Sequence, residues 1–144
     1  MERDRIVVGV DGSAPSRRAL EWAIELAAEL HAEIVAVHAA DLGPAAVVLA
    51  DARNAPSYDE LRHRLEAAVR DDWCAPLGPS GVAHRVEVRE GGPALVLIAV
   101  ADEVGARMIV VGPRGGGGFP GLALGSVGVQ LAQHAHRPVT IVRA

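Results

Sequence analysis

The sequence predicts an α/β fold, a doubly wound parallel sheet with helices on both faces. Short apolar stretches alternate with longer amphipathic ones along all 144 residues, as expected for strands joined by crossover helices. Half of the residues are apolar but only 3% are aromatic, so small aliphatic side chains must build the core, which suits strands buried on both faces. A chain of this length fits one domain, and we expect residues 1–144 to form it.

Five stretches have the length and composition of strands, namely residues 5–10, 33–39, 82–89, 107–111 and 138–143. The first helix is predicted over residues 13–30, because its apolar residues recur at a helical spacing: Leu20, Ala23, Ile24, Ala27 and Ala28. Residues 41–56 form an alanine-rich loop to which the sequence assigns no role.

Three further helices are marked by their ends. Ser57 and Glu60 form a capping box before a helix that has Leu61, Leu65, Ala68, Val69 and Trp73 on one face and that ends at Pro76. Pro93 is placed as the first residue of the next helix, and Gly105 as its stop. Ser126 is predicted to cap a last helix that runs to about residue 135.

Composition excludes several classes of function. The net charge is −4 and arginines do not cluster, which argues against nucleic acid and membrane surfaces as partners. All 14 basic residues are arginine, so enzymes and receiver domains that need a lysine are excluded, including nucleotide-binding proteins with a Walker A motif. A single cysteine, Cys74, permits no internal disulfide. No apolar run is long enough for a signal peptide or membrane span, so a cytoplasmic protein with a small soluble ligand is expected.

The glycine-rich segment GPRGGGGFPGLALGS, residues 112–126, leads from the fourth strand to the last helix. Gly112, Gly115, Gly125 and Ser126 follow the spacing G-x2-G-x9-G-[S/T], typical of a loop whose backbone N–H groups hold phosphate at a helix start. Glycines would allow a close approach to the oxygens and positive φ angles where N–H groups converge. A flexible surface loop followed by an ordinary capping serine explains the same spacing, and the residues alone leave both interpretations open.

The same segment contains a misleading match to a dinucleotide-binding motif. Gly116, Gly118 and Gly121 fit G-x-G-x-x-G, but they follow the fourth strand rather than the first. No Asp or Glu occurs after Glu103 to bind a ribose, so we reject a dinucleotide site.

Asp11 ends the first strand in the sequence VVGVDGS. In a doubly wound sheet, ligands bind beyond the carboxyl ends of the strands, where a carboxylate can accept hydrogen bonds from a ribose or a base or hold a metal through water. An Asp before Gly12 is equally suited to form a turn, with Ser13 as the cap of the following helix.

These residues resemble the universal stress protein family. The resemblance rests on VVGVDGS, on IVAVHA in the second strand and on the final third from MIVVGPRGGGG to RPVTIVR, and its glycine spacing is that of the ATP-binding branch. It implies an adenine nucleotide alpha hydrolase-like fold with strand order 3-2-1-4-5, a homodimer, and ATP bound between strands one and four.

The resemblance also implies the site residues. Val10 and Asp11 match contacts to adenine and ribose, and Ala39 matches a backbone contact to the base. The ribose and phosphate positions are matched by Gly112, Arg114, Gly115, Gly125, Ser126 and Val127. Pro113 departs from the family, because a small hydroxyl residue is usual there, and Gly116 and Gly117 replace a usual basic residue. Arg114 is then the only cation of the loop, so we expect Mg²⁺ or Mn²⁺ to accompany ATP.

Other candidate residues have simpler interpretations. His38 is expected to be a hydrogen-bonded histidine of the core and Cys74 a packed apolar group. His134 and His136 lack a third ligand and are expected to place charge near a helix end rather than to bind metal.

The expected function is that of an ATP-binding stress-response regulator that acts as a nucleotide-dependent switch, with at most slow hydrolysis, since no general base or other catalytic residue is evident. One alternative is a dimeric interaction module that has lost nucleotide binding, which Pro113 and the glycine run favour. Another is a small hydrolase or transferase of adenine nucleotides with a catalytic residue from residues 41–56. The homodimer is expected to form through residues 138–143, whose apolar edge would otherwise be unpaired.

Overall fold

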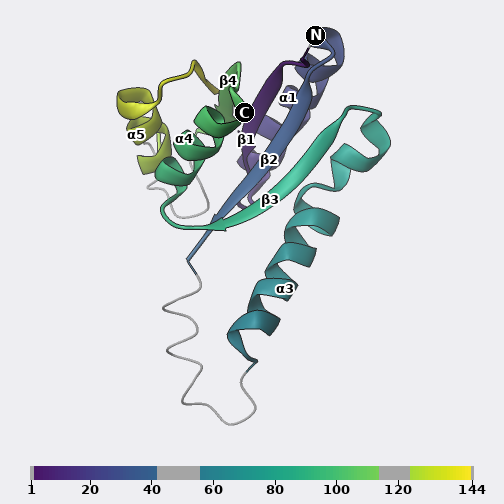
Figure 1. Cartoon of the computed structure of the whole chain (residues 1–144), viewed down its shortest axis with the longest axis vertical. Helices are drawn as coiled ribbons and strands as arrows, with labels where there is room; N and C mark the ends of the chain where they lie inside the picture. Colours follow the sequence, from purple (N-terminus) through teal and green to yellow (C-terminus); the bar gives the residue numbers. More distant parts are fainter. Residues whose placement is uncertain (1, 42–55, 114–123, 144) are drawn as a thin grey trace.

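The computed structural model describes residues 2–41, 56–113 and 124–143. Its centre is a five-stranded sheet in the order β3-β2-β1-β4-β5, in which every pair of neighbours is parallel. The strands are β1 (Arg5–Gly9), β2 (Glu33–Ala40), β3 (His84–Glu90), β4 (Met108–Val111) and β5 (Val139–Ile141), as Figure 1 shows for most of the sheet. The predicted fold class and strand order are confirmed.

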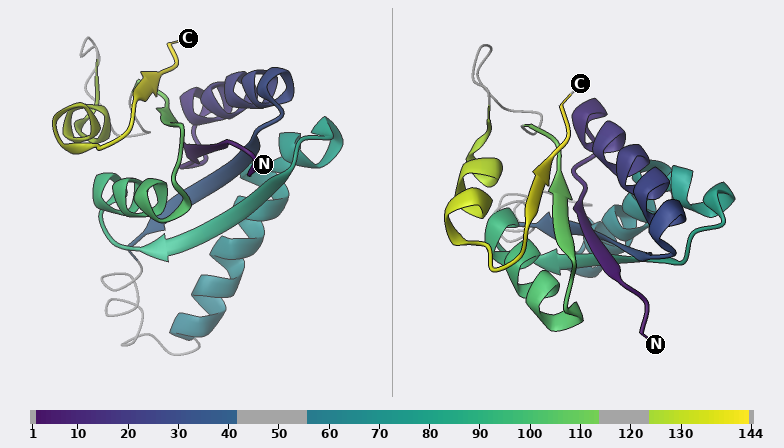
Figure 2. Two further views of the ribbon diagram at one scale, coloured as in Figure 1. Left: turned by 45° about the horizontal axis from the view of Figure 1, so that its top comes forward. Right: turned by 90° about the horizontal axis from the view of Figure 1, so that it is seen from above.

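Helices lie on both sides of the sheet, as predicted. Helices α1 (Ala14–Leu30) and α3 (Tyr58–Ala68) lie on one side, and α4 (Pro93–Val104) and α5 (Ser126–His134) lie on the other (Figure 2). Side chains of β1 alternate between the two layers, so Ile6 and Val8 pack under α1 while Val7 packs under α4. These three side chains are fully buried, and the central strand is therefore covered on both faces.

The second helix is shorter than predicted. Helix α3 ends at Ala68 and is followed by a π-helical turn, η1 (Val69–Trp73), and a 3₁₀ segment, η2 (Ala75–Ser80). The N–H of Cys74 donates to the carbonyl of Val69 at 2.9 Å, five residues back, and both side chains are buried in the core under α1. Packing of this segment against the core changes the helix type well before Pro76, which lies inside η2 rather than at a helix end.

Most predicted helix ends are confirmed. The hydroxyl oxygens of Ser13 and Ser57 accept hydrogen bonds from the N–H groups three residues on and cap α1 and α3. Pro93 is the first residue of α4, and Gly105 ends it with a φ of +62°. The prediction for Ser126 was wrong, because Gly125 is the cap of α5 and Ser126 is its first helical residue. The carbonyl of Gly125, and not that of Ser126, accepts the first helical hydrogen bond, from Val129 at 3.2 Å.

Candidate functional site

Strand β1 lies between β2, which the chain reaches through α1 on one face of the sheet, and β4, which it reaches through α4 on the other face. The site predicted at this switch point therefore lies at the carboxyl ends of these three strands. We call this region the carboxyl edge and define it as residues 10–13, 38–41 and 112–113. Val10, Asp11, Ala39 and Gly112 of the predicted site all belong to it.

A ring of hydrogen bonds fixes the carboxylate of Asp11. Its Oδ1 accepts from the N–H of Ser13 at 2.9 Å and from the hydroxyl of Ser13 at 2.5 Å. The N–H of Asp11 donates to the hydroxyl of Ser16 at 3.1 Å, and the N–H of Ser16 donates to the hydroxyl of Ser13 at 3.2 Å. Asp11 thus forms the predicted turn, yet its residue is exposed and its Oδ2 has no hydrogen-bond partner among the described residues. The two sequence-based interpretations of Asp11 are compatible.

The backbone of Ala39 faces the place where β1 has ended. In β2, the carbonyl of Val37 accepts a hydrogen bond from the N–H of Val10, on the β1 side, at 2.9 Å. The carbonyl of Ala40 instead accepts from the N–H of Gly91, which follows β3, at 3.0 Å. Because successive residues of a strand bond to opposite neighbours, the N–H and C=O of Ala39 point to the β1 side. Within the described ranges no backbone group pairs with them beyond β1. As far as the structure describes the chain, this donor and this acceptor have no backbone partner, which is what the predicted base contact requires.

Sequence reasoning missed the role of Trp73 at this edge. The ring centroids of Trp73 and His38 are 4.9 Å apart, with the planes at 83°. Gly12 has a φ of +83°, and a Cβ there would lie only 2.6 Å from Cε2 of Trp73. The indole therefore fills the space that a side chain at residue 12 would need. The sequence signal was Gly12 itself, which indicates either a turn or a close neighbour but not which neighbour.

The prediction that His38 is hydrogen-bonded is confirmed. Its Nδ1 lies 2.7 Å from the carbonyl oxygen of Val10, and because a carbonyl only accepts, Nδ1 carries the proton. The bond ties the end of β2 to the end of β1 on the face of the sheet that carries α1, since Ile34 and Ala36 of the same strand parity lie in that core.

The described part of the glycine-rich segment is packed and internally bonded. A Cβ at Gly112 would lie 3.0 Å from the carbonyl oxygen of Pro15, so Gly112 lets the chain after β4 touch the start of α1. The N–H of Gly125 donates to the carbonyl of Pro113 at 2.6 Å, which joins the two ends of the segment. Gly125 has a φ of −82°, so the expectation of a positive φ is wrong at this position. Predicted site residues Arg114 and Gly115 lie outside the described residues.

Ser126 and Val127 open helix α5 after Gly125. Ser126 is exposed, and Val127 packs partly against the core under α4. The first N–H groups of a helix have no partner within the helix and carry partial positive charge, so this end of α5 favours an anion.

His136 lies away from this edge. Nδ1 of His136 lies 2.8 Å from a carboxylate oxygen of Asp102 in α4, and this contact lowers the pKa of Asp102. His136 thus pairs with another helix rather than with the end of α5, and no group of three metal-binding side chains occurs in the part of the chain that the structure describes. Cys74 is 2% exposed, which confirms the predicted packed cysteine, and burial raises the pKa of its thiol to about 11.

A shallow cavity of about 240 Å³ occurs at the opposite, amino end of the sheet. It lies between the end of α1 and the chain before β3, and its lining includes Ala28, His31 and Val82. This lining is built mainly of small side chains and contains no residue of the predicted site.

The family model described as "Universal stress protein family" matches residues 2–143. The chain belongs to the universal stress protein family. The universal stress protein YxiE of Bacillus subtilis is 32% identical over 149 residues, which cover 97% of this chain and 99% of the relative. No helix in the described ranges is long and apolar enough to cross a membrane.

Two solved universal stress proteins have the same fold. The universal stress protein UspA from Lactobacillus plantarum superposes with a TM-score of 0.75 at 24% identity and covers 99% of this chain and 100% of its own. A universal stress protein solved in complex with cAMP gives a TM-score of 0.67 at 28% identity, with 99% of this chain and 98% of that chain covered. The second protein binds an adenine nucleotide.

Proposed function

We propose that this universal stress protein binds ATP at the carboxyl edge and acts as a nucleotide-dependent switch in a stress response. The observation that carries the proposal is that the fixed Asp11 carboxylate and the backbone groups of Ala39, which have no backbone partner among the described residues, both occur at the carboxyl edge. One is suited to a ribose hydroxyl, and the other offers a donor and an acceptor to the edge of a base. The cAMP complex of a family member supports an adenine nucleotide as the ligand class.

The proposed site assigns each end of the nucleotide to different elements. Val10 and Ala39 contact the base, and Asp11 contacts the ribose. The phosphates lie toward the start of α5, where the contacts come from Gly112, Arg114, Gly115, Gly125, Ser126 and Val127. Since Gly125 already donates its N–H to Pro113, the N–H groups of Ser126 and Val127 are the donors expected to meet phosphate oxygen.

Mg²⁺ or Mn²⁺ is proposed to arrive with the nucleotide. The described residues do not gather three metal-binding side chains, so they form no cation site on their own. Phosphate oxygens would supply most ligands, and Oδ2 of Asp11 can reach the ion through water. When bound, the ion offsets phosphate charge that a single arginine leaves uncompensated.

Isothermal titration calorimetry with ATP and Mg²⁺ tests the proposal, together with mass spectrometry of any nucleotide that copurifies. Asp11→Asn should weaken ATP binding at least about tenfold, since the hydrogen bonds of a carboxylate are roughly twice as strong as neutral ones. Glu25→Gln, an exposed acid on α1, is the matched control and should bind as the wild type does. Wild-type protein that binds no adenine nucleotide would refute the proposal.

The alternative, an interaction module without nucleotide, is favoured by one specific contact. The hydrogen bond of Gly125 to Pro113, at 2.6 Å, occupies an N–H that a phosphate could otherwise bind. Calorimetry separates the two functions, because the interaction module binds no ATP.

We also propose that the protein is a single-domain, cytoplasmic homodimer that pairs through residues 138–143. Strand β5 pairs with β4 on one side only, and Val139 and Ile141 remain partly exposed at the edge of the sheet. Antiparallel pairing with a second copy would cover this edge. Light scattering at micromolar concentration should give the mass of a dimer, and a monomer mass would contradict the proposal.

A further inference from the structure

We propose that the indole of Trp73 forms one wall of the nucleobase subsite and contributes to the preference for an aromatic base. This inference rests on the proposed nucleotide binding. It is carried by the position of Trp73 against Gly12, which follows the end of β1, and against His38, which precedes Ala39 in β2.

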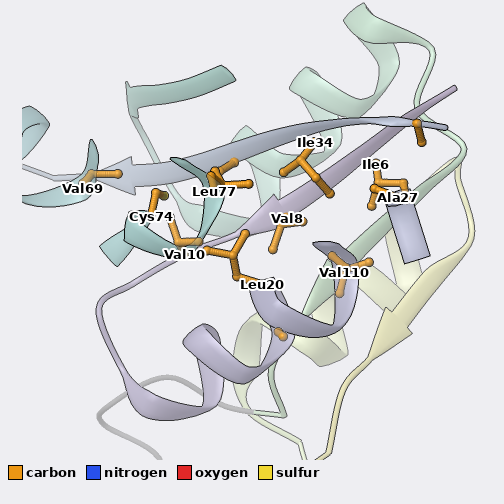
Figure 3. Close-up of a cluster of buried hydrophobic side chains, with 14 residues drawn as sticks. Ile6, Val8, Val10, Leu20, Ala27, Ile34, Val69, Cys74, Leu77 and Val110 are labelled. Carbon is orange, nitrogen blue, oxygen red and sulfur yellow. The ribbon is translucent and has the colours of Figure 1, made fainter. Parts of the chain in front are cut away.

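The main chain holds Trp73 firmly. It is the last residue of the π-helical turn η1, whose hydrogen bond runs from the N–H of Cys74 to the carbonyl of Val69. Val69, Cys74 and Leu77 on either side of it are at most 2% exposed. Figure 3 labels these three side chains among the core residues under β1 and β2. Because these flanking side chains are buried, the main chain that carries Trp73 is anchored in the core, and π-helical turns occur often at functional sites.

Two contacts place the indole at the base end of the site. One is with Gly12, the residue after Asp11, and the other is with His38, the residue before Ala39. His38 is in turn bonded to the carbonyl of Val10. Trp73 therefore lies against the sequence neighbours of Asp11 and Ala39, and its neighbour His38 is hydrogen-bonded to Val10, although Trp73 comes from a segment far away in the sequence.

Ala39 and Trp73 offer a base two different kinds of contact, one polar and one apolar. The N–H and C=O of Ala39 point along the sheet toward the end of β1, where they can meet the polar edge of a base. Trp73 lies on the face of the sheet that carries α1, where it packs against the core but stays partly exposed. A base bonded to Ala39 would then present an apolar surface to the indole. Contacts between bases and aromatic side chains are usually worth about fivefold to a hundredfold in affinity.

Fluorescence of the Trp22→Phe variant reports on Trp73 alone, because the sequence contains 2 tryptophans. This protein would be titrated with ATP and Mg²⁺, and separately with tripolyphosphate and Mg²⁺, a probe that lacks the base. We expect ATP to change the emission of Trp73 and tripolyphosphate to leave it unchanged. Calorimetry verifies that ATP saturates the protein. If the emission of Trp73 is unchanged at saturation, the inference is overturned.

Calorimetry of Trp73→Leu supplies a second, independent readout. The affinity for ATP should fall at least about fivefold, while the affinity for tripolyphosphate should stay at the wild-type value. Trp73→Phe should restore most of the ATP affinity. Trp22→Leu, which changes a tryptophan of α1 that is 37% exposed, is the matched control.

The outcomes separate this inference from the proposed function. Wild-type protein without affinity for ATP would overturn both. Normal ATP affinity in folded Trp73→Leu would overturn only the role of Trp73, and so would an equal loss of affinity for ATP and tripolyphosphate, which would indicate a merely structural role. Tighter ATP binding in this variant would mean that the indole occupies the base position instead of lining it. Should Trp73→Leu fail to fold, Trp73→Phe and the fluorescence titration still decide.

Discussion

Gly112 packs against the backbone of Pro15, so the chain that leaves β4 touches the first turn of α1. A Cβ at Gly112 would approach the carbonyl oxygen of Pro15 at 3.0 Å and its carbonyl carbon at 3.1 Å. Both are backbone atoms and cannot move aside cheaply. The glycine therefore has a structural reason to be present, besides any contact with phosphate, and it fixes the distance between two of the loops that form the carboxyl edge.

Gly112→Ala should lower the free energy of unfolding by roughly 1 to 3 kcal/mol, the usual cost of forcing an extra group into a packed site. Urea denaturation followed by circular dichroism measures this change. Gly78→Ala is the control, because nothing lies within 4 Å of a Cβ there. Equal stability of the two variants would contradict the close approach of Gly112 to Pro15.

Gly12→Ala should destabilise the protein more than Gly81→Ala. Both glycines have similar positive φ angles, +83° and +73°, so both variants incur backbone strain of about 1 to 2 kcal/mol. Only at Gly12 does the new Cβ also meet the indole of Trp73, at 2.6 Å. Thermal unfolding of both variants isolates that contact. In a double-mutant cycle, Trp73→Leu should relieve part of the cost of Gly12→Ala, and strict additivity would argue against the contact.

Ser13→Ala and Ser57→Ala should cost similar stability, about 1 kcal/mol each, because both hydroxyl groups cap a helix at a distance of 3.2 Å. Only the hydroxyl of Ser13 also bonds to the carboxylate of Asp11. We therefore expect Ser13→Ala alone to weaken ATP binding, as measured by calorimetry. Equal ATP affinities in the two folded variants would show that Asp11 needs no support from Ser13.

The stability of the protein should fall above pH 9 because of Cys74. Burial raises the pKa of this thiol from 9.0 to about 11 in the folded state. The unfolded chain thus loses its proton first, and stability that is complete below pH 9 declines as the pH rises through about 11. Denaturation curves between these pH values should show a steeper decline for the wild type than for Cys74→Ala. Parallel declines would mean that the thiol is not protected by burial.

Gly125→Val tests the glycine-rich segment as a phosphate site. With a φ of −82° and a ψ of 176°, Gly125 has a backbone conformation that valine adopts readily, so the circular dichroism spectrum should stay near that of the wild type. A side chain beside the N–H of Ser126 should nevertheless reduce ATP affinity at least about tenfold, or about 1.4 kcal/mol. Arg114→Ala should reduce it less, because an exposed charge is screened by salt. Unchanged ATP binding by folded Gly125→Val would contradict the phosphate site and mean that the glycine-rich segment only connects β4 to α5.

The order of strands and helices along the chain could be predicted from the sequence, because it depends on local patterns. The spacing of apolar residues identified each element, and most predicted strand ends lie within a residue or two of those observed. Ser13, Ser57, Pro93 and Gly105 marked helix ends correctly, since a cap depends only on residues within one turn. The position of Asp11 at the end of β1 followed from the same local signals.

Tertiary structure alone decided how these elements meet. The π-helical turn after α3 forms because Val69 and Cys74 are both drawn into the core under α1, which no pattern within residues 57–76 reveals. The same packing brings Trp73 to Gly12 and His38, and the meeting of two loops explains Gly112 by its contact with Pro15. Ser126 has a residue type that suits a helix cap. The hydrogen bond from Gly125 to Pro113, which joins the two ends of the glycine-rich segment, lies one residue earlier, and Gly125 is the cap of α5. Each of these features depends on atoms that approach within a few ångströms across long stretches of sequence, and local propensity carries no record of such neighbours.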